Sequence, residues 1–146
     1  PIGPIKQHYD SSLSTEFTQD EQITMMSLWS IFRSPLIIGG EMTKFDDFTM
    51  GLITNEDILK MHRNARHSHP VWQREIDGTE HILWTAVSSE GGQYAVIFNT
   101  VRIPLQDLEI YHPVHSTELW SGQTSEIAET INVSLKKHGA PVFYLN

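Results

Sequence analysis

Two pairs of adjacent acidic residues in the first half of the chain, Asp46-Asp47 and Glu56-Asp57, superficially suggest acid–base chemistry. Two carboxylates that face each other can divide the acid and base roles of a reaction between them. Neighbouring residues on a helix do not face each other, and each pair stands where a helix is predicted to begin. Negative charge there stabilises the positive end of the helix dipole. We therefore interpret both pairs as N-terminal helix charges.

A further acidic candidate, Glu41, follows the apolar run Leu36–Ile38 and the pair Gly39-Gly40. A short, continuous apolar run predicts a strand buried on both faces, as in a parallel sheet, and the glycines permit a tight turn at its end. The active sites of parallel α/β barrels lie at the C-terminal ends of their strands. Glu41 is therefore either a carboxylate at the edge of a substrate pocket or, the more common case, a loop carboxylate.

Eight histidines raise the question of a metal site. His67 and His69 could place two rings on one side of a strand, and His62 is close in sequence. No carboxylate accompanies them at a recognisable ligand spacing, and the chain has no cysteine for a thiolate or a disulfide. We predict structural or surface roles and no metal ligands. The same applies to the turn histidines, which are His112, His115 and His138.

Aromatic side chains of the second half could stack on flat ligands such as sugar rings. They are Trp72, Trp84, Tyr94 and Trp120. Because they alternate with aliphatic neighbours, we favour packing in a core, as we do for Trp29 in an apolar helix. Asn132-Val133-Ser134 matches the N-glycosylation sequon, which has meaning only in a eukaryotic secretory pathway.

The first half alternates helices with the predicted strand, in the rhythm of a parallel α/β barrel. Thr18–Glu21 fits the capping box, in which the Thr and Glu side chains satisfy backbone N–H groups at a helix start. Almost every residue of Met25–Phe32 is apolar, which indicates a helix buried on most sides, and Ser34-Pro35 ends it. One strand with three helices cannot pair its own sheet edges, so we expect these residues to need partners outside this sequence.

Asn64–Pro70 is polar and histidine-rich, and we predict it to be a linker or a domain boundary. Beyond it, short strands separated by turns at Asp77-Gly78 and Gly91-Gly92 replace the helical period. The predicted strands are Val71–Ile76, His81–Val87, Tyr94–Phe98, Ile103–Tyr111, Thr117–Trp120, Ile131–Leu135 and Val142–Leu145. They indicate an antiparallel β-sandwich of about 80 residues. The predicted fold class is thus α/β plus all-β: the terminal segment of a (β/α)8 TIM barrel followed by an antiparallel β-sandwich.

The run Asp20–Glu41, DEQITMMSLWSIFRSPLIIGGE, resembles the seventh-helix and eighth-strand segment of glycoside hydrolase family 27, the α-galactosidase type. Leu52–Glu56 is similar to the family's LLTN-E helix start, and Pro1–Gly3 resembles the residues after its seventh-strand motif. Four further stretches resemble landmarks of the family's C-terminal β-domain: Ile82–Thr85, Tyr94–Asn99, Glu118–Trp120 and His138–Ala140. The resemblance covers nearly the whole chain.

This resemblance implies a barrel end over residues 1–66 and a β-sandwich over residues 67–146. It implies a retaining enzyme for terminal α-galactoside-type linkages, with two aspartates at the ends of the fourth and sixth barrel strands. Those strands would precede this chain, so we expect an inactive, structural C-terminal fragment without catalytic residues. Glu41 is the substrate-binding candidate, and Ile2 and Gly3 would lie near the same barrel mouth. No metal or organic cofactor is implied.

One departure from the family pattern concerns the NQD-P segment that many members carry after the LTN helix. Here Met61–Arg66 reads MHRNAR, which favours a divergent bacterial branch. The sequence does not decide which sugar the parent enzyme recognises, because the specificity residues would lie mostly upstream. Galactose, N-acetylgalactosamine and arabinopyranose stay open.

Two other classes of function stay open: a carbohydrate-binding β-sandwich module and a protein-interaction domain. Exposed, coplanar aromatic rings would favour the first. The fragment and interaction hypotheses both predict that residues 17–61 expose an apolar face larger than a soluble monomer normally tolerates. We expect that face to meet the remainder of the catalytic barrel or a second copy of the chain.

The 146 residues carry a formal net charge of −8, with a pI near 5.4. An acidic chain lacks the Lys/Arg clusters that phosphates demand, so we predict no nucleic-acid partner and no anionic membrane partner. No apolar run reaches the ~18 residues of a membrane span, and no signal peptide is visible. The absent initiator Met suggests that the true N-terminus lies upstream. The compartment stays unknown, with a periplasmic or secreted bacterial protein as one option.

Overall fold

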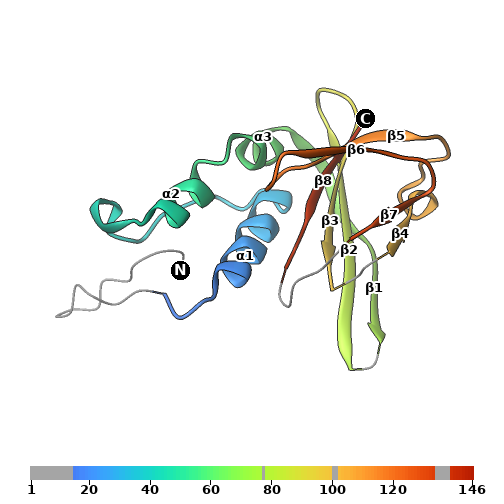
Figure 1. Cartoon of the computed structure of the whole chain (residues 1–146). Coiled ribbons are helices and arrows are strands. Elements are labelled where there is room, and N and C mark those ends of the chain that lie inside the picture. The colour runs from blue at the N-terminus through green and yellow to red at the C-terminus, as the bar shows by residue number, and fades with distance from the viewer. Residues whose placement is uncertain (1–14, 77, 100–101, 134–138) are drawn as a thin grey trace.

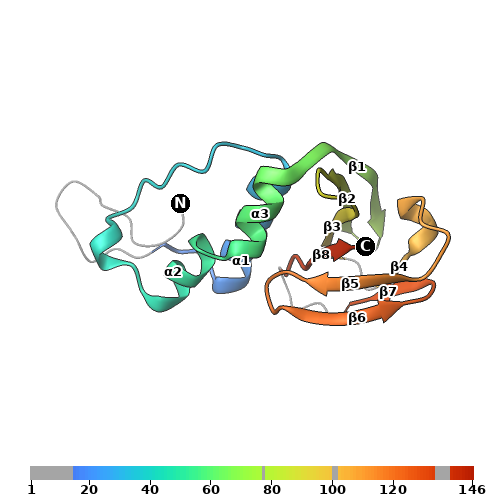
Figure 2. The same cartoon turned by 90° about the horizontal axis from the view of Figure 1, so that it is seen from above.

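The computed structural model describes residues 15–76, 78–99, 102–133 and 139–146. The helices lie on one side of the molecule and the strands on the other (Figures 1 and 2). None of the helices in these ranges combines the length and the apolar character that crossing a bilayer requires. Predictions about Ile2, Gly3, Ser134 and His138 fall outside the described residues.

Helix α1 (Gln19–Ile31) begins with the predicted capping box. The backbone N–H of Thr18 donates to Glu21 Oε2 at 2.8 Å, and the backbone N–H of Glu21 donates to Thr18 Oγ1 at 3.3 Å. The helix ends before Arg33, whose φ of 57° turns the chain away, and Pro35 prevents its continuation. The predicted start and end of this helix are confirmed.

The strand predicted over Leu36–Ile38 is wrong for this chain, because these residues form no strand. The expected burial is also absent, since Ile37 is 82% exposed and Ile38 46% exposed. A parallel strand needs a hydrogen-bonded neighbour, and every strand pair among the described residues is antiparallel and lies elsewhere. The segment leads instead into the short 3-10 helix η1 (Met42–Lys44).

Two short helices, α2 (Asp47–Ile53) and α3 (Glu56–Asn64), carry the chain back to the β-structure. Asp46 caps α2 by accepting a 2.7 Å hydrogen bond from the N–H of Thr49, and Asn55 caps α3 by accepting one of 2.9 Å from the N–H of Ile58. Both helices bury their apolar side chains toward α1, which contacts each of them. The helix starts expected at these positions are confirmed.

Six antiparallel strands form the main sheet in the order β1-β2-β3-β8-β5-β6, and β4 pairs with β7 in a small second sheet. The strands are β1 (Ala65–Ile76), β2 (Thr79–Ser88), β3 (Gln93–Phe98), β4 (Arg102–Pro104), β5 (Val114–Glu118), β6 (Gln123–Ile127), β7 (Thr130–Asn132) and β8 (Val142–Leu145). The predicted antiparallel β-sandwich is confirmed.

Three local predictions in this half need correction. The stretch Asn64–Pro70 is not a linker, because β1 already begins at Ala65 and pairs with β2, with irregular register on either side of His69-Pro70. Ile103–Tyr111 is not one strand, because Pro104 ends β4 and the 3-10 helix η2 (Leu105–Leu108) follows. Strand β6 was not predicted, because its only buried residue is Ile127 and no apolar alternation marks it.

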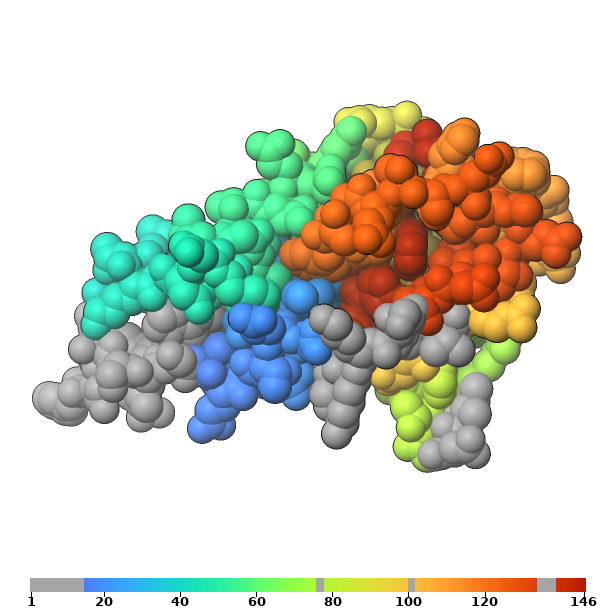
Figure 3. Space-filling model, in the orientation of Figure 1, coloured from blue at the N-terminus to red at the C-terminus, as the bar shows by residue number. Residues whose placement is uncertain are grey.

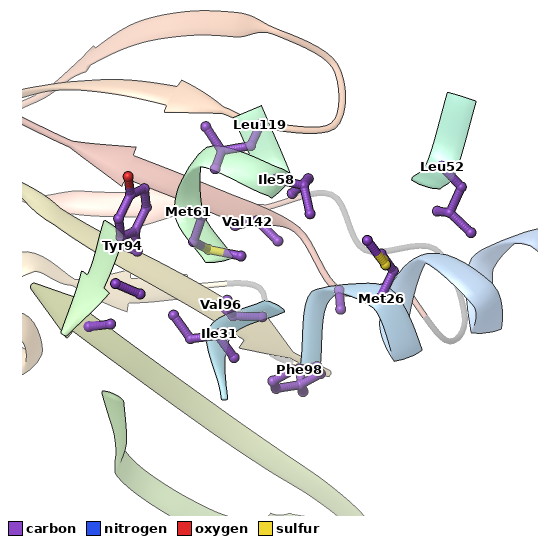
Figure 4. Packing of buried hydrophobic residues seen from close by; sticks show 13 residues of the cluster. Met26, Ile31, Leu52, Ile58, Met61, Tyr94, Val96, Phe98, Leu119 and Val142 are labelled. Atoms are coloured by element: carbon purple, nitrogen blue, oxygen red, sulfur yellow. The ribbon is translucent and has the colours of Figure 1, made fainter. Parts of the chain in front are cut away.

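The main sheet is covered on both faces, which its alternating side chains explain. On β3, Tyr94, Val96 and Phe98 point toward the helices, while Ala95 and Ile97 point toward the second sheet. The first cluster joins the sheet to α1 and α3 around Ile31, Ile58 and Met61 (Figure 4). The second cluster packs the sheet against β4, β7 and η2. The helices therefore complete the hydrophobic core of the β-structure.

The turn between β2 and β3 requires glycine at position 92. Gly92 has a φ of +73°, and a Cβ there would overlap the carbonyl oxygen of Leu145 at the end of β8. Gly78 in the β1–β2 turn has a similar φ of +71°, but a Cβ at Gly78 would meet no atom within 4 Å. Both positions therefore require a positive φ, but only at position 92 would an added Cβ collide with a neighbouring atom.

We predict that Gly92→Ala destabilises the chain more than Gly78→Ala. Each alanine must adopt a left-handed conformation, at a cost of about 1 kcal/mol. Gly92→Ala also forces β8 and the turn apart, which adds about 1–3 kcal/mol. Urea unfolding of both variants measures the difference. Equal losses would show that the close packing of the turn against β8 contributes nothing.

Candidate functional site

The structure places the acidic candidates in local roles. Asp46 caps α2, and hydrogen bonds from the Thr49 side chain and backbone hold the pKa of its carboxyl below the ordinary value. Asp47, Glu56 and Asp57 lie in first helical turns. The interpretation of both acid pairs as helix charges is confirmed.

Glu41 is half-buried and precedes η1. Its carboxylate accepts a 3.3 Å hydrogen bond from Thr43 Oγ1 and lies 3.9 Å from Lys44 Nζ. Both charged side chains are more than a third exposed, so this ion pair contributes little to stability. These contacts hold Glu41 in its loop and leave its proposed contact with a sugar untested.

The rings of His62, His69 and His112 contact backbone carbonyl oxygens. His62 Nε2 donates to the carbonyl oxygen of Ser34 at 2.9 Å and ties α3 to the end of α1, while His69 Nδ1 lies 2.7 Å from the carbonyl oxygen of His67. No group of three or more His, Asp or Glu side chains in the described ranges could hold a metal ion.

The aromatic side chains of the β-structure are engaged in internal contacts. Tyr94 is buried. Trp72 Nε1 donates to Asp107 Oδ2 at 2.9 Å, and Trp84 Nε1 donates to Ser68 Oγ at 2.5 Å. The Trp84 ring also lies 4.4 Å from that of Phe32, centroid to centroid. These contacts favour the packing role and leave no row of coplanar exposed rings among these residues.

A buried serine links α1 to the β-structure. Ser27 Oγ accepts a 2.9 Å hydrogen bond from Trp120 Nε1 and is 2.8 Å from the carbonyl oxygen of Ile23 and 3.3 Å from that of Ala140. Because Ser27 is fully buried, removal of its hydroxyl would leave the indole N–H of Trp120 without this acceptor. Sequence analysis missed this residue, although a serine inside the apolar run Met25–Phe32 is the available signal.

An apolar groove of about 410 Å³ lies on the opposite side of α1, between that helix and the segment that leads to α2. Its described lining carries no charged side chain: Met26, Trp29, Leu36, Ile37, Ile38, Gly39, Phe45, Ile53 and Leu59. Six of the eight large apolar side chains that are exposed in the described ranges fall within residues 17–61: Phe17, Phe32, Ile37, Ile38, Met42 and Met50. A soluble monomer rarely concentrates apolar exposure in this way. The apolar groove is the candidate functional surface.

Residues 78–145 match the family model of the α-galactosidase C-terminal β-sandwich domain. The crystal structure of a family 27 β-L-arabinopyranosidase from Geobacillus stearothermophilus superposes with a TM-score of 0.89 and 35% sequence identity, over 99% of this chain and 35% of that chain. The chain corresponds to the C-terminal part of a glycoside hydrolase family 27-like enzyme. The family resemblance expected from the sequence is therefore confirmed.

More distant proteins also resemble the chain in sequence or in fold. The α-galactosidase A of Aspergillus niger is 25% identical over 138 residues, which span 88% of this chain and 25% of that protein. The α-galactosidase I of Mortierella vinacea shares the fold, with a TM-score of 0.77 at 16% identity over 88% of this chain and 36% of that chain. The chain spans 20–36% of the length of the curated relatives it matches.

We predict that Ser27→Ala destabilises this family 27 chain by about 1–3 kcal/mol, because the indole N–H of Trp120 is left buried without a partner. Ser30→Ala is the matched control. Ser30 is equally buried on α1, but its hydroxyl has no hydrogen-bond partner in the described structure. Both changes raise helix propensity alike, so Ser30→Ala should be neutral or stabilising. Thermal unfolding compares them, and similar losses would refute the link.

We also predict that Asp46→Asn lowers stability at neutral pH and has less effect in acid. Asn keeps the cap but removes the charge. The folded-state pKa of Asp46 is lowered, so its stabilising contribution is present above the unfolded-state pKa of about 3.9 and is lost as the pH falls through the folded-state pKa. Melting temperatures of both proteins from pH 7 downward test this. A difference that does not change with pH would contradict it.

Proposed function

We propose that this chain is the non-catalytic C-terminal part of a retaining glycoside hydrolase that cleaves terminal α-galactoside-type linkages. The apolar groove beside α1 is the observation that carries the proposal. Its described lining lacks charge, and it lies on a helix that is apolar around most of its circumference. Such a helix is stable in water only when other parts of a protein cover it.

In this proposal the remainder of the catalytic barrel covers the groove. Residues 1–66 would form the end of the barrel and residues 67–146 the β-sandwich. The change from helix to strand lies two residues before this division, since α3 ends at Asn64 and β1 begins at Ala65. The two catalytic carboxylates would come from the covering part, as the mechanism requires a pair that flanks the scissile bond. Glu41 would border the sugar pocket as a binding residue.

A second substrate is favoured by one observation. The solved structure with 35% identity over 99% of this chain is a β-L-arabinopyranosidase. An α-galactoside and a β-L-arabinopyranoside share the arrangement of ring hydroxyls and differ in the exocyclic hydroxymethyl group. The proposal therefore includes β-L-arabinopyranosides as the second candidate, whereas the internal hydrogen bonds of Trp72 and Trp84 argue against a module that stacks sugars on a row of exposed rings.

The test is a chimera in which this chain replaces the matching C-terminal third of the Geobacillus enzyme. We expect the chimera to hydrolyse 4-nitrophenyl β-L-arabinopyranoside or 4-nitrophenyl α-D-galactopyranoside, and the 146-residue chain alone to hydrolyse neither. Hydrolysis by the chain alone would overturn the proposal and return Glu41, Asp46 and Asp47 as catalytic candidates.

Two substitutions in the chimera test the role of the groove. Ile37→Asp places a carboxylate on the groove lining and should lower activity by about tenfold or more, because a buried, unpaired charge is costly. Val87→Asp is the control, since Val87 is also an exposed apolar residue, on β2, and does not line the groove. An active Ile37→Asp chimera would show that the barrel does not cover this surface.

A further inference from the structure

A second groove lies on another side of α1, where the first turns of that helix meet the β5–β6 hairpin. Its volume is about 660 Å³, which lies within the range of small-ligand sites. Figure 3 looks onto the side of the molecule where the blue surface of α1 meets the orange surface of this hairpin. We refer to this hollow as the polar groove.

The side chains that line the polar groove suit an uncharged, hydroxyl-rich ligand. Gln123, Thr124 and Asn132 offer amide and hydroxyl groups, which both donate and accept hydrogen bonds. Asp20 and Glu118 add carboxylates, and the described lining contains no lysine or arginine. The two carboxylates disfavour an anionic ligand beside them. Sugar hydroxyls can donate to carboxylates and amide oxygens.

Trp120 supplies the apolar surface of the polar groove and is held on two sides. Its indole N–H donates to Ser27, and its backbone N–H donates to Glu118 Oε1 at 3.3 Å. The same carboxylate accepts from the N–H of Ser121 at 2.8 Å and from that of Val142 at 3.2 Å. A ring fixed in this way loses little entropy when a ligand packs against it.

Two polar side chains of the groove have unused capacity. Within the described part of the chain, the side chains of Asp20 and Gln123 form no hydrogen bond with another residue. They come from different elements, the first turn of α1 and the start of β6. Both line one hollow with Trp120, so a single ligand can contact all three.

We propose that the polar groove binds a neutral saccharide, with one pyranose ring packed on Trp120 and its hydroxyls bonded to Asp20 and Gln123. The inference is independent of the proposed hydrolase function, because it rests on residues of this chain alone. An inactive chimera would contradict the hydrolase function and leave the saccharide site standing. Absence of saccharide binding would contradict the site and leave the hydrolase function standing.

Heteronuclear NMR of the 146-residue chain tests the proposal, with methyl α-D-galactopyranoside and methyl β-L-arabinopyranoside as probes. The chain has four tryptophans, so four indole N–H signals report on four places. We expect a saturable shift of the Trp120 indole signal and of the backbone amides of Ser121, Gln123 and Thr124. The indole signals of Trp29, Trp72 and Trp84 should stay unchanged. Absence of a saturable shift for both glycosides would overturn the proposal.

A matched pair of variants locates the binding. Gln123→Ala removes an exposed side chain whose hydrogen-bonding groups are unused, so it should leave the fold intact and weaken binding by about three- to tenfold. Gln106→Ala, in η2, removes the same groups from another exposed position and should not change affinity. Equal affinities of the two variants would refute the site.

Charge provides a further test of the ligand class. Methyl α-D-glucuronate carries a carboxylate and should bind more weakly than methyl α-D-galactopyranoside, because Asp20 and Glu118 face the groove. Glycerol should cause no saturable shift, since it has hydroxyls but no ring to pack on Trp120. Equal binding of glucuronate or glycerol would overturn the assignment to neutral saccharides.

Discussion

The structure depends on the burial of one helix. Helix α1 has apolar residues around most of its circumference, so no single contact can cover it. The face with Met26, Ser27 and Ile31 packs against the sheet and α3. The side with Trp29 remains open along the apolar groove. The same helix therefore closes the core on one side and lines an open apolar groove on the other.

Polar contacts of α1 and of the N-cap of α3 determine how the helices are oriented on the sheet, which apolar packing alone would leave less defined. Ser27 accepts from Trp120 and reaches Ala140, and Asn55 donates to the carbonyl oxygen of Leu119 at 3.3 Å. These contacts join residues 64–113 positions apart in the sequence. In the proposed enzyme they would fix the sandwich relative to the barrel wall. The helical arm and the sheet consequently form one structural unit, despite their different sequence patterns.

Local rules predicted much of this fold. The capping box at Thr18, the helix starts at Asp46 and Asn55, and the alternation of Ile82, Trp84 and Ala86 depend on neighbours a few residues away, which a sequence displays directly. The prediction for Leu36–Ile38 failed because a strand needs a neighbouring strand to pair with, and none of the described strands pairs with these residues. Strand β6 went unnoticed because its side chains are mostly exposed and carry no apolar signal. Ser27 and the two grooves depend on long-range contacts that no local pattern encodes.

Strand β8 occupies the middle of the main sheet, between β3 and β5, although it comes last in the chain. During synthesis β1, β2 and β3 can pair as soon as they leave the ribosome, and so can β5 and β6. The two groups cannot join until residue 145 has emerged, because only β8 connects them. Until then β3 and β5 each present an unpaired edge to the cytosol or to a chaperone. The growing chain is therefore vulnerable to edge-to-edge aggregation until β8 has formed, and the loss of β8 would divide the sheet in two.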